Sequence, residues 1–593
     1  MQQKSWRSRI ENNPQRAHAP YFKQPASMKH PVFGSLLIPV SLALFTSHAW
    51  ADGPLRGNPV DALPTIERPP AAAPQTPVAP TPEQQAVAAR LAQHIVPRHF
   101  DVSGVKTLPF EEVSAFLTPL AGKDITVAQL VTEVDKITAL YRERGYPLSF
   151  ALVQNQDFAD GLVVVTVVEG YIDTVRIDGD LGNAQARLQD LAQPLLQDRP
   201  LKQATLERVL NLMRTVPGVS FTPALELPKR ANGATELSVN ATRKKFTGNG
   251  GVADMGTGMQ PMVNVGANSL TPLGEQVRLT ASVPLNTDDV RYFSADVRVP
   301  VGNDGWAIKV DGYHYQAKPR DEAIQYLGFG RKVTTDRIGV GVSYPLLLNN
   351  RRSLTGTLGV YATNAKDRYD QHNSDNWLRE DSRVRAATAE LRYLDVLPER
   401  STDATVSVSK GVDSMGARAK ITSNYGYQAT PATDLDFTLW NLSVRQAVTL
   451  PAQFGLVLSG AGQYSSDILL SSEQVSYGSW RFGMGYPQGE ISGDKGLGLS
   501  AEVNRRFNIG YKYLQALQPY ALVDYARSWY NNPALKPVNP KHLSSVALGF
   551  RVTDDKYYLF DFNIAKPVGS VTANDRDRDI RFNANYSLFY DAL

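Results

Sequence analysis

Hydrophobic residues recur with a helical period in the middle of the chain and with a period of two in its last part. Between residues 97 and 245 the pattern predicts the order strand, helix, helix, strand, strand, and it predicts that order twice. The two units are about 75 residues long and cover 97–170 and 171–245. We therefore predict two tandem α+β domains, each with a mixed sheet that two helices cover on one side.

Each unit contains sequence signals for its individual helices and strands. In the first unit, the longer helix has apolar residues on one face from Val127 to Tyr141 and stops at Gly145, a typical C-cap residue. The predicted segments of this unit are RHFDVSGV, LPFEEVSAFLTPL, TVAQLVTEVDKITALYRERGY, LSFALVQ and GLVVVTVVEG. Those of the second unit are YIDTVRIDGD, NAQARLQDLAQPLL, LKQATLERVLNLMRTV, GVSFTPALELP and ATELSVNATRK.

Beyond residue 245, apolar and polar residues alternate and no long helical pattern remains. In the last such segment, polar residues separate Ile580, Phe582, Ala584, Tyr586, Leu588 and Tyr590. The 348 residues from 246 to 593 hold about 16 strands of roughly ten residues, with room for long loops. A secreted soluble β-protein also alternates, but single cores rarely grow this large. We favour an antiparallel outer-membrane β-barrel, whose apolar face meets lipid and whose polar face lines a lumen.

An apolar run near the N-terminus predicts export. It extends from Val32 to Phe45, follows Lys29 and His30, and is followed by Ala49-Trp50-Ala51, with small residues spaced as in a signal-peptidase site. A transmembrane anchor is the alternative, but the run is short for one and Pro39 interrupts it. We predict a signal sequence with a basic leader over 1–51, translated from Met1 or from Met28.

Two segments connect the signal sequence to the first domain. Nine prolines in 52–82 predict an extended linker. The next segment, EQQAVAARLAQHI, has Val87, Leu91 and Ile95 on one face and predicts a short helix within 83–96.

Composition and motifs argue against an enzyme. The chain has no cysteine, which excludes disulfides, thiol catalysis and cysteine-bound zinc. Its 62 basic and 58 acidic residues nearly balance, so a nucleic-acid partner is not expected. The sequence contains no G-x-S-x-G, H-E-x-x-H or G-x-x-x-x-G-K-[ST], and its histidines are scattered. We expect no catalytic residue, no metal and no cofactor.

Residues 83–593 resemble the TpsB transporters of two-partner secretion, the ShlB/FhaC/HecB type of the BamA-related superfamily. The repeats are similar to POTRA domains, most clearly in RERGYPLSFALVQNQDFADGLVVVTVVEGYIDTVRIDG. Two such units favour TpsB over BamA-type assembly factors, which usually carry more. The resemblance implies a monomer in the outer membrane of a Gram-negative bacterium, in contact with its lipid and with POTRA domains in the periplasm.

The stretch RFGMGYPQGEISGDKG, residues 481–496, is similar to a loop that these barrels fold back into their own lumen. Its glycines allow positive φ and close backbone approach. The predicted lumen-loop motif comprises Arg481, Gly483, Gly485, Tyr486, Gly489, Glu490, Ser492, Gly493 and Asp494.

One position departs from the family pattern. The family's arginine, which pairs with an aspartate of the barrel wall, falls on Met484, whereas the aspartate remains as Asp524 in LVDYA. Arg481 could pair with Asp524 through charge-assisted hydrogen bonds. Alternatively, loop N–H groups or Tyr486 bind Asp524, or Lys495 replaces the arginine.

The resemblance implies capture of an unfolded TpsA-type exoprotein, haemolysin-like or adhesin-like, and its passage through the barrel. We place capture on the strand that contains Phe150, Leu152 and Gln154 and on the helix beside it, because an open strand edge pairs with an extended peptide. Core packing is the competing interpretation for Phe150 and Leu152. A plugging helix is not recognisable ahead of the first domain. An outer-membrane assembly factor, a diffusion porin and a soluble adhesin remain alternatives.

Overall fold

The computed structural model describes residues 78–79, 91–154, 156–158, 160–230, 232–254, 259–282, 290–319, 325–326, 328–480, 482–532, 542–573 and 576–589. The signal sequence expected over 1–51 lies outside these residues. So do most of the linker and most of the helix expected within 83–96. None of the described helices combines the length and the apolar character needed to cross a membrane.

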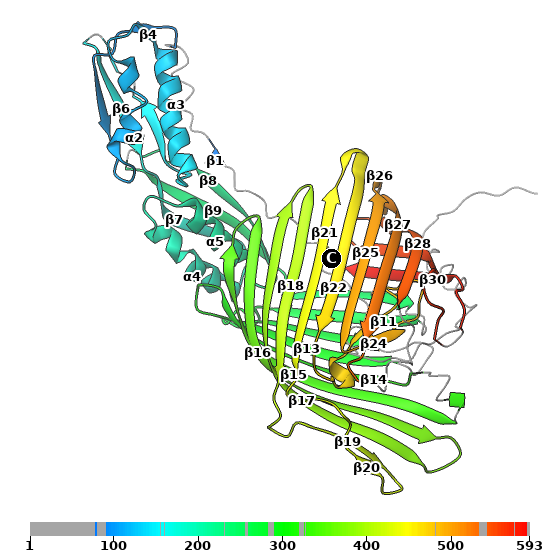
Figure 1. Cartoon of the computed structure of the whole chain (residues 1–593). Coiled ribbons are helices and arrows are strands. Elements are labelled where there is room, and N and C mark those ends of the chain that lie inside the picture. Colours follow the sequence, from blue (N-terminus) through cyan, green and yellow to red (C-terminus); the bar gives the residue numbers. More distant parts are fainter. Residues whose placement is uncertain are drawn as a thin grey trace, which may run out of the picture. The chain divides into compact units, whose positions relative to one another are not determined.

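The first domain is a three-stranded sheet in the order β3-β6-β5 with helices packed against it (Figure 1). Along β6, the side chains of Val163, Val165 and Val167 alternate into the core, where they meet the apolar face of α3. Thr126 begins α3 with a capping box to Gln129. The bounds are β2 (His94–Ile95), β3 (His99–Ser103), α2 (Phe110–Ser114), η3 (Thr118–Leu120), β4 (Ile125–Thr126), α3 (Val127–Glu143), β5 (Phe150–Val153) and β6 (Leu162–Val168).

Three local predictions differ from the structure. The end of the helix expected within 83–96 is extended instead, because His94–Ile95 pairs with β4. The helix expected over 108–120 is divided into α2 and η3, whose first turn contains Pro119. The linker was expected to take no part in a sheet, yet β1 (Val78–Ala79) pairs with β8 in parallel, since neither of its residues is proline.

The second domain repeats the element order of the first. Its sheet has the order β1-β8-β9-β7, and α4 and α5 pack on it through a leucine-rich core that includes Leu188, Leu195 and Leu206. The bounds are β7 (Tyr171–Asp178), α4 (Ala184–Gln197), α5 (Gln203–Arg214), β8 (Val219–Glu226) and β9 (Ala234–Arg243).

Glu169, in the Val-Glu-Gly sequence at the end of β6, joins β6 by hydrogen bonds to the segment after β3 and to α3. Its carboxylate accepts hydrogen bonds from the N–H groups of Lys106 and Thr107 (2.9 and 2.8 Å), from the Thr107 hydroxyl (2.8 Å) and from the Tyr141 hydroxyl (2.9 Å). Burial disfavours the charged form of Glu169, but these hydrogen bonds outweigh it and lower the pKa of its carboxyl. Burial and the Glu169 carboxylate raise the pKa of Tyr141, so it remains a donor.

From residue 246 the described strands close into one barrel. Nineteen β segments are present in the barrel among the described residues. Three of them, β19, β20 and β26, are extensions of β18, β21 and β25, respectively, so the segments form sixteen strands. The prediction of an antiparallel barrel of about 16 strands is therefore confirmed. The bounds are β10 (Phe246–Asp254), β11 (Met259–Asn268), β12 (Gln276–Ser282), β13 (Val290–Val301), β14 (Trp306–Ala317), β15 (Phe329–Leu348), β16 (Arg352–Gln371), β17 (Trp377–Leu397), β18 (Arg400–Gly411), β19 (Arg418–Ser423), β20 (Gln428–Ala429), β21 (Thr438–Thr449), β22 (Phe454–Tyr464), β25 (Lys495–Arg505), β26 (Phe507–Tyr511), β27 (Leu514–Trp529), β28 (Leu543–Thr553), β29 (Tyr558–Pro567) and β30 (Arg581–Phe589).

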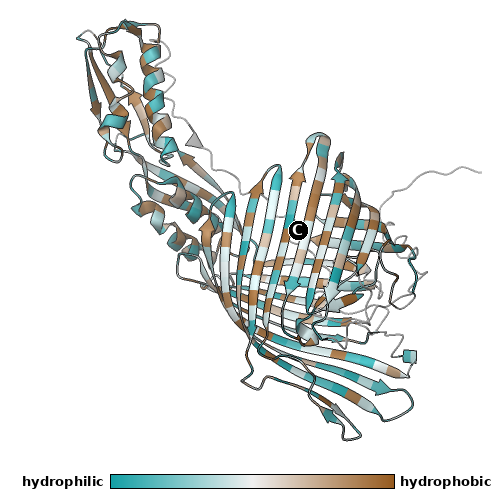
Figure 2. Ribbon diagram, in the orientation of Figure 1, coloured by the Kyte–Doolittle hydropathy of each residue, from teal (hydrophilic) through white to brown (hydrophobic). Residues whose placement is uncertain are grey.

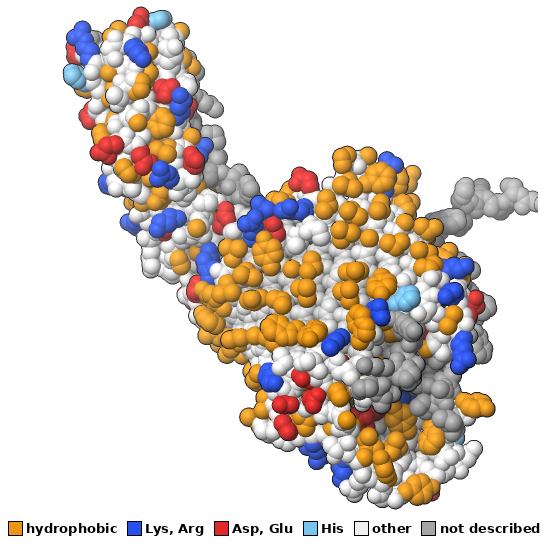
Figure 3. Space-filling model, in the orientation of Figure 1, with side chains coloured by type: hydrophobic (Ala, Val, Ile, Leu, Met, Phe, Trp, Pro, Cys, Tyr) orange, Lys and Arg blue, Asp and Glu red, His pale blue; other side chains and the backbone are white. Residues whose placement is uncertain are grey.

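The period-two pattern separates an apolar outer surface from a polar lumen. Brown and paler or teal residues alternate along the strands in Figure 2, and apolar side chains gather on the barrel surface in Figure 3. On β30, for example, Phe582 is 62% exposed on the outside, whereas Asn583 is 3% exposed inside. Outward apolar residues on other strands include Val263, Leu279, Ile308, Leu358, Leu442, Leu499, Val523 and Leu548.

Hydrogen bonds join α5 to two turns of the barrel. The Arg208 guanidinium donates to Asp304 Oδ1 (2.9 Å) and to the Tyr344 hydroxyl (3.0 Å). Asn211 Nδ2 donates to Asn350 Oδ1 (2.9 Å). Both turns lie at the barrel end where β10 begins, directly after the second domain.

We predict that Glu169→Gln destabilises the first domain by about 1 kcal/mol, because charge-assisted hydrogen bonds to a partly exposed carboxylate are lost. Since the folded-state pKa of Glu169 is lowered, its contribution is present above the unfolded value of about 4.3 and is lost as the pH falls through the folded pKa. The difference between the parent protein and the variant should therefore be full near pH 7 and shrink below pH ~4. Limited proteolysis of the full chain in detergent, over a temperature ramp, measures it. Glu143→Gln, at an exposed acid of α3 in the same domain, is the control and should have no effect. An equal loss in both variants would contradict the prediction.

Candidate functional site

The segment between β22 and β25, residues 465–494, folds back inside the barrel. It contains η5 (Ser471–Glu473) and a small hairpin of β23 (Val475–Tyr477) and β24 (Ile491–Gly493). Most of its described residues from 469 to 494 are buried. It hydrogen-bonds to residues of β16, β22, β27 and β30, which belong to different parts of the wall, so it occupies the lumen.

Asp524 holds the tip of this lumen loop through backbone groups. Its Oδ2 accepts the Met484 N–H (2.8 Å), and its Oδ1 accepts the Ser545 N–H (3.1 Å) and the Ser545 hydroxyl. On the other side of the tip, Asn583 Nδ2 donates to the Met484 carbonyl (3.2 Å). Met484, at the family's arginine position, packs with Ala547 and Ala565. The tip is therefore bound to β27, β28 and β30 together.

The structure shows which of the described candidate groups contacts Asp524. Arg481 lies outside the described residues, so its pairing with Asp524 stays a prediction. The Tyr486 hydroxyl donates to the Ser570 carbonyl instead (2.7 Å). The Lys495 ammonium lies 5.0 Å from the centre of the Tyr464 ring. Among the alternatives, the loop backbone N–H is the group in contact with Asp524.

Two motif glycines permit backbone contacts that a side chain would block. A Cβ at Gly485 would lie 2.7 Å from the Pro567 nitrogen, and one at Gly493 would lie 2.6 Å from the Trp529 carbonyl oxygen. Both obstacles are backbone atoms of wall strands or of their ends, which cannot rotate away. Glycine at these two positions therefore lets the tip and the base of the loop lie closer to the wall than a residue with a Cβ would allow. Gly483 and Gly489 have φ values of +135° and +71°.

The acidic residues of the motif fix the base of the loop. Asp494 is fully buried and accepts the N–H groups of Leu469 (3.0 Å) and Asn531 (2.7 Å). Glu490 Oε1 accepts the Ala573 N–H (2.5 Å), and the Ser492 and Tyr530 hydroxyls are 2.8 Å apart. These contacts connect the loop to the segments after β27 and β29. The motif is therefore mainly a set of acceptors for backbone donors.

A second carboxylate attaches the loop to the opposite wall. Glu473 in η5 is 6% exposed, and its Oε2 accepts the Tyr361 hydroxyl of β16 (2.8 Å). The Arg337 guanidinium of β15 lies 3.9 Å from the centre of the Tyr361 ring. Gln463 Nε2 of β22 donates to the Glu473 carbonyl (2.9 Å). Sequence reasoning did not single out Glu473, Tyr361 or Ser545, because each lies in an ordinary alternating or polar segment without a motif.

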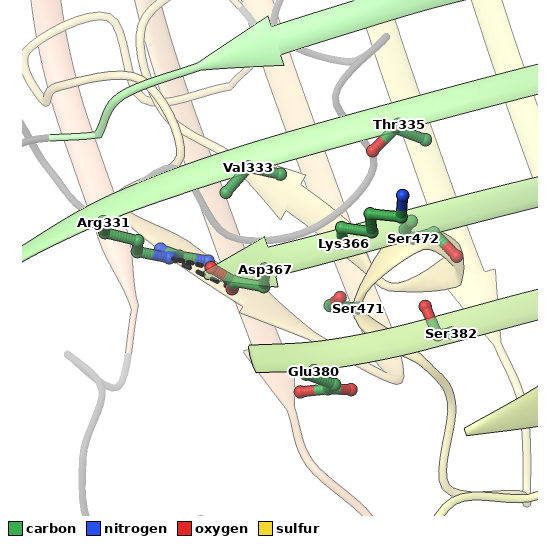
Figure 4. Close-up of a pocket in the computed structure, with 10 residues that line it drawn as sticks. Arg331, Val333, Thr335, Lys366, Asp367, Glu380, Ser382, Ser471 and Ser472 are labelled. Carbon is green, nitrogen blue, oxygen red and sulfur yellow. Dashed lines mark hydrogen bonds and ion pairs between the residues drawn. The ribbon is translucent and has the colours of Figure 1, made fainter. Parts of the chain in front are cut away.

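A small polar cavity lies between this part of the loop and the wall (Figure 4). Arg331 and Asp367 form a bidentate ion pair at its side, with Nη2 2.6 Å from Oδ2. Ser471 and Ser472 of η5 face it from the loop, and Glu380 and Ser382 line it from β17. The lumen beside η5 is therefore polar.

The strand expected to capture a client is an edge strand. Among the described residues, β5 pairs only with β6. Phe150 is 6% exposed and packs with Val168 and Leu227, and Leu152 packs against the same cluster, as the core interpretation expects. Gln154 is exposed and its Nε2 donates to the Thr166 hydroxyl (3.1 Å).

The backbone of this edge is partly occupied. Thr138 of α3 accepts the outward N–H of Ala151 (3.0 Å). Because successive residues of a strand alternate in direction, Val153 presents its N–H and C=O on the same outward side. Within the described part of the chain, no group of three or more His, Cys, Asp or Glu side chains could hold a metal ion.

We predict that Asp524→Ala releases the loop tip, because it leaves the buried N–H groups of Met484 and Ser545 without an acceptor, at about 1–3 kcal/mol each. Gln488, at the tip, is 7% exposed, and the parent chain has no cysteine, so a Gln488→Cys background reports opening. Labelling by a membrane-impermeant thiol reagent should accelerate at least ~10-fold with Asp524→Ala. The control, Asp311→Ala, removes an acid of β14 that bonds to no loop residue in the described structure. Faster labelling in the Asp311→Ala variant, or an unchanged labelling rate in the Asp524→Ala variant, would refute the assignment.

We predict that Tyr361→Phe frees η5 by removing the hydroxyl donor to the buried Glu473 carboxylate. Labelling of Ser472→Cys should rise about 5-fold or more, whereas labelling at the tip changes less. Adding Glu473→Gln to Tyr361→Phe should cost little more, because the two side chains act as one contact. Fully additive effects would show that they act independently. Tyr292→Phe, at a tyrosine of β13, is the control.

Comparisons with known proteins agree with this architecture. A profile described as "POTRA domain, ShlB-type" matches residues 95–170, and one described as "Haemolysin secretion/activation protein ShlB/FhaC/HecB" matches residues 236–552. The outer membrane transporter CdiB of Escherichia coli is 23% identical over 476 residues, 76% of this chain and 75% of that protein. The heme/hemopexin transporter protein HuxB of Haemophilus influenzae (strain 86-028NP) is 18% identical over 472 residues, 77% of this chain and 80% of that protein.

Solved structures show the same fold. CdiB from Escherichia coli superposes with a TM-score of 0.62 at 20% identity, covering 88% of this chain and 94% of that one. BamA from Haemophilus ducreyi lacking POTRA domains 1-3 gives a TM-score of 0.51 at 13% identity, covering 84% of this chain and all of that one. With a ShlB-type POTRA domain, a closed barrel and a family profile over more than half of its length, the chain belongs to the ShlB/FhaC/HecB family of haemolysin secretion/activation proteins, the outer-membrane TpsB transporters of two-partner secretion.

Proposed function

We propose that this protein recognises one unfolded exoprotein in the periplasm through its POTRA domains and passes it through the barrel to the cell surface. The observation that carries the proposal is the way in which the lumen is filled. The 465–494 loop occupies it through hydrogen bonds to Asp524, Tyr361 and Asn583, with a polar cavity beside it. Water or a passing polypeptide can replace such bonds one by one. Movement of the loop also separates the apolar cluster of Tyr477, Tyr486 and Ile491 from the wall.

Capture uses strand pairing at the first POTRA domain. An extended segment that pairs with the outward side of β5 meets Val153 first, because Thr138 already holds the Ala151 N–H. Gln154 is exposed beside this edge, whereas Phe150 and Leu152 support the strand from the core side. Main-chain pairing of this kind accepts many sequences, so selectivity depends on the few side chains around the edge.

Secretion assays separate this function from its alternatives. Candidate passengers with an N-terminal secretion domain are followed in cells with and without the protein. We expect one passenger to disappear from the medium and the cell surface while the levels of other outer-membrane proteins stay constant. A joint decrease of many barrel proteins would identify an assembly factor, the function that the BamA-like fold also permits. Unchanged secretion together with lost ion permeability would identify a porin.

A variant of the capture edge tests the route. Val153→Pro removes the outward N–H of β5 and should reduce secretion of the passenger at least ~10-fold, since proline cannot donate to a strand ladder. Val102→Pro changes β3, the opposite edge of the same sheet, and controls for loss of stability. Thermal unfolding of both variants must be compared first. Equal secretion defects at equal stability would contradict capture at β5 and leave the transport assignment intact.

A further inference from the structure

Strands β15, β16 and β17 are 20, 20 and 21 residues long, about twice what a bilayer requires of a barrel strand. Their outward residues near the periplasmic end are apolar. Ile338, Leu358, Val360 and Leu391 are 57, 68, 59 and 44% exposed. This apolar belt ends at the level of Ile338 and Ala362, which are partners in register. The remaining length of these strands extends beyond the belt, away from the POTRA domains.

The outward face above the belt is densely cationic. Inward residues of this region, such as Thr335, Thr363, Ser382 and Ala419, are buried, so the residues between them point out of the barrel. In register across β15, β16, β17 and β19, the first row above the belt is Asp336, Asn364, Arg383 and Arg418. The second row is Thr334, Lys366, Asp381 and Lys420, and the third is Lys332, Arg368, Arg379 and Thr422.

We call the outward cations of these rows, with Arg385 at the edge of the belt, the outer cationic patch. It has eight Lys and Arg residues against three carboxylates, Asp336, Asp370 and Asp381. In Figure 3, blue and red side chains gather below the orange surface, over the region where Figure 1 labels β17 and β19. The cations are Lys332, Lys366, Arg368, Arg379, Arg383, Arg385, Arg418 and Lys420.

The patch places like charges directly opposite one another. Arg383 faces Arg418, and Arg368 lies between Lys332 and Arg379. Such pairs destabilise a sheet unless an anion lies between them. The carboxylates compensate only part of this charge, because Asp370 pairs with Arg368 (2.8 Å) and Asp381 with Arg379 (2.7 Å). Among the described residues, Lys366, Arg383 and Arg418 have no carboxylate within ion-pair distance.

An aromatic residue marks the level of the patch. The Trp377 ring lies 5.5 Å from the guanidinium carbons of both Arg368 and Arg379. Trp377 is the register partner of Asp370, so its ring lies one row beyond the third row, at the end of the patch farthest from the belt. Tryptophan beside basic residues is enriched at the membrane–water interface. Because strands alternate in direction and β10 begins at the second POTRA domain, the patch lies toward the outer leaflet.

We propose that the outer cationic patch binds the phosphate groups of the phosphorylated glycolipid that forms the outer leaflet. Arg383, Arg418 and Lys366 form its centre: Arg383 and Arg418 are register partners, Lys366 lies diagonal to Arg383, and none of the three has an ion-pair partner among the described residues. Guanidinium groups bind phosphate oxygens in bidentate fashion, and basic clusters beside a membrane recognise anionic headgroups. The acyl chains of the same lipid lie on the apolar belt directly below, around Ile338 and Leu358. This arrangement favours a lipid over free phosphate, because both halves of the molecule meet a matching surface.

Binding to the full-length protein in detergent micelles tests the proposal. Native mass spectrometry follows titrations with diphosphoryl lipid A, with its dephosphorylated form and with inorganic phosphate. The test variant combines Lys366→Gln, Arg383→Gln and Arg418→Gln. The control combines Lys495→Gln, Arg505→Gln and Arg527→Gln, which remove three cations that each lie over an aromatic ring elsewhere on the barrel. Heat-modifiable migration confirms that each barrel is folded.

We expect the parent protein and the control to bind diphosphoryl lipid A at least ~10-fold more tightly than the dephosphorylated form, and the test variant to lose this preference. Equal binding of the two lipids, or an unchanged preference in the test variant, would overturn the proposal. Saturation by inorganic phosphate at the same concentrations would assign the patch to a free anion and would also overturn it. Secretion activity is not part of the readout, so the result is independent of the proposed transport function.

Discussion

The pairing of every backbone group in the membrane is the constraint on which the rest of this structure depends. Lipid offers no hydrogen-bond partner to a strand edge, so the sheet closes on itself where β10 meets β30, from Asn249↔Phe589 to Ala253↔Asn585. Closure fixes which face of each strand meets lipid and which faces inward. Sixteen strands then enclose a space too wide to be filled by the wall side chains alone. A segment of the chain must occupy that space or water will.

The lumen loop fills it with polar contacts and with small apolar clusters, one of which packs Tyr477, Tyr486 and Ile491 against Ala526 and Leu543 of the wall. Three buried or nearly buried carboxylates, Glu473, Asp494 and Asp524, each accept at least one hydrogen bond that joins loop and wall. Such a network specifies one position of the loop, since a displaced carboxylate would leave N–H groups without partners. It also limits what is lost on opening, because water can satisfy each group that the protein releases. The same hydrogen bonds are therefore compatible both with one specific position of the loop and with its reversible movement.

The parts that depend on local periodicity were predictable from the sequence. Alternation along the last 348 residues indicated the barrel, and helical spacing with Gly145 indicated the first domain. The glycine-rich motif located the lumen loop in sequence, but not its contacts. Asp524 bonds to the backbone of Met484, and a backbone N–H leaves no signature in a sequence. Glu473 and Tyr361 are 112 positions apart, so only the closed barrel brings them together. Phe150 supports the core because Leu227 of the next domain covers it, a tertiary contact that strand periodicity does not reveal.

The pairing of β1 with β8 has a consequence for any peptide that approaches the second POTRA domain. Val78–Ala79 occupies part of the outer edge of β8, opposite Leu225 and Glu226. This short strand is joined to the domain by the chain itself, so it competes as an intramolecular ligand whose effective concentration is on the order of millimolar. A peptide free in the periplasm displaces this strand only if it binds the edge of β8 tightly enough to overcome that effective concentration, for example by pairing over more residues. The linker thereby sets a threshold that weak and short segments do not pass.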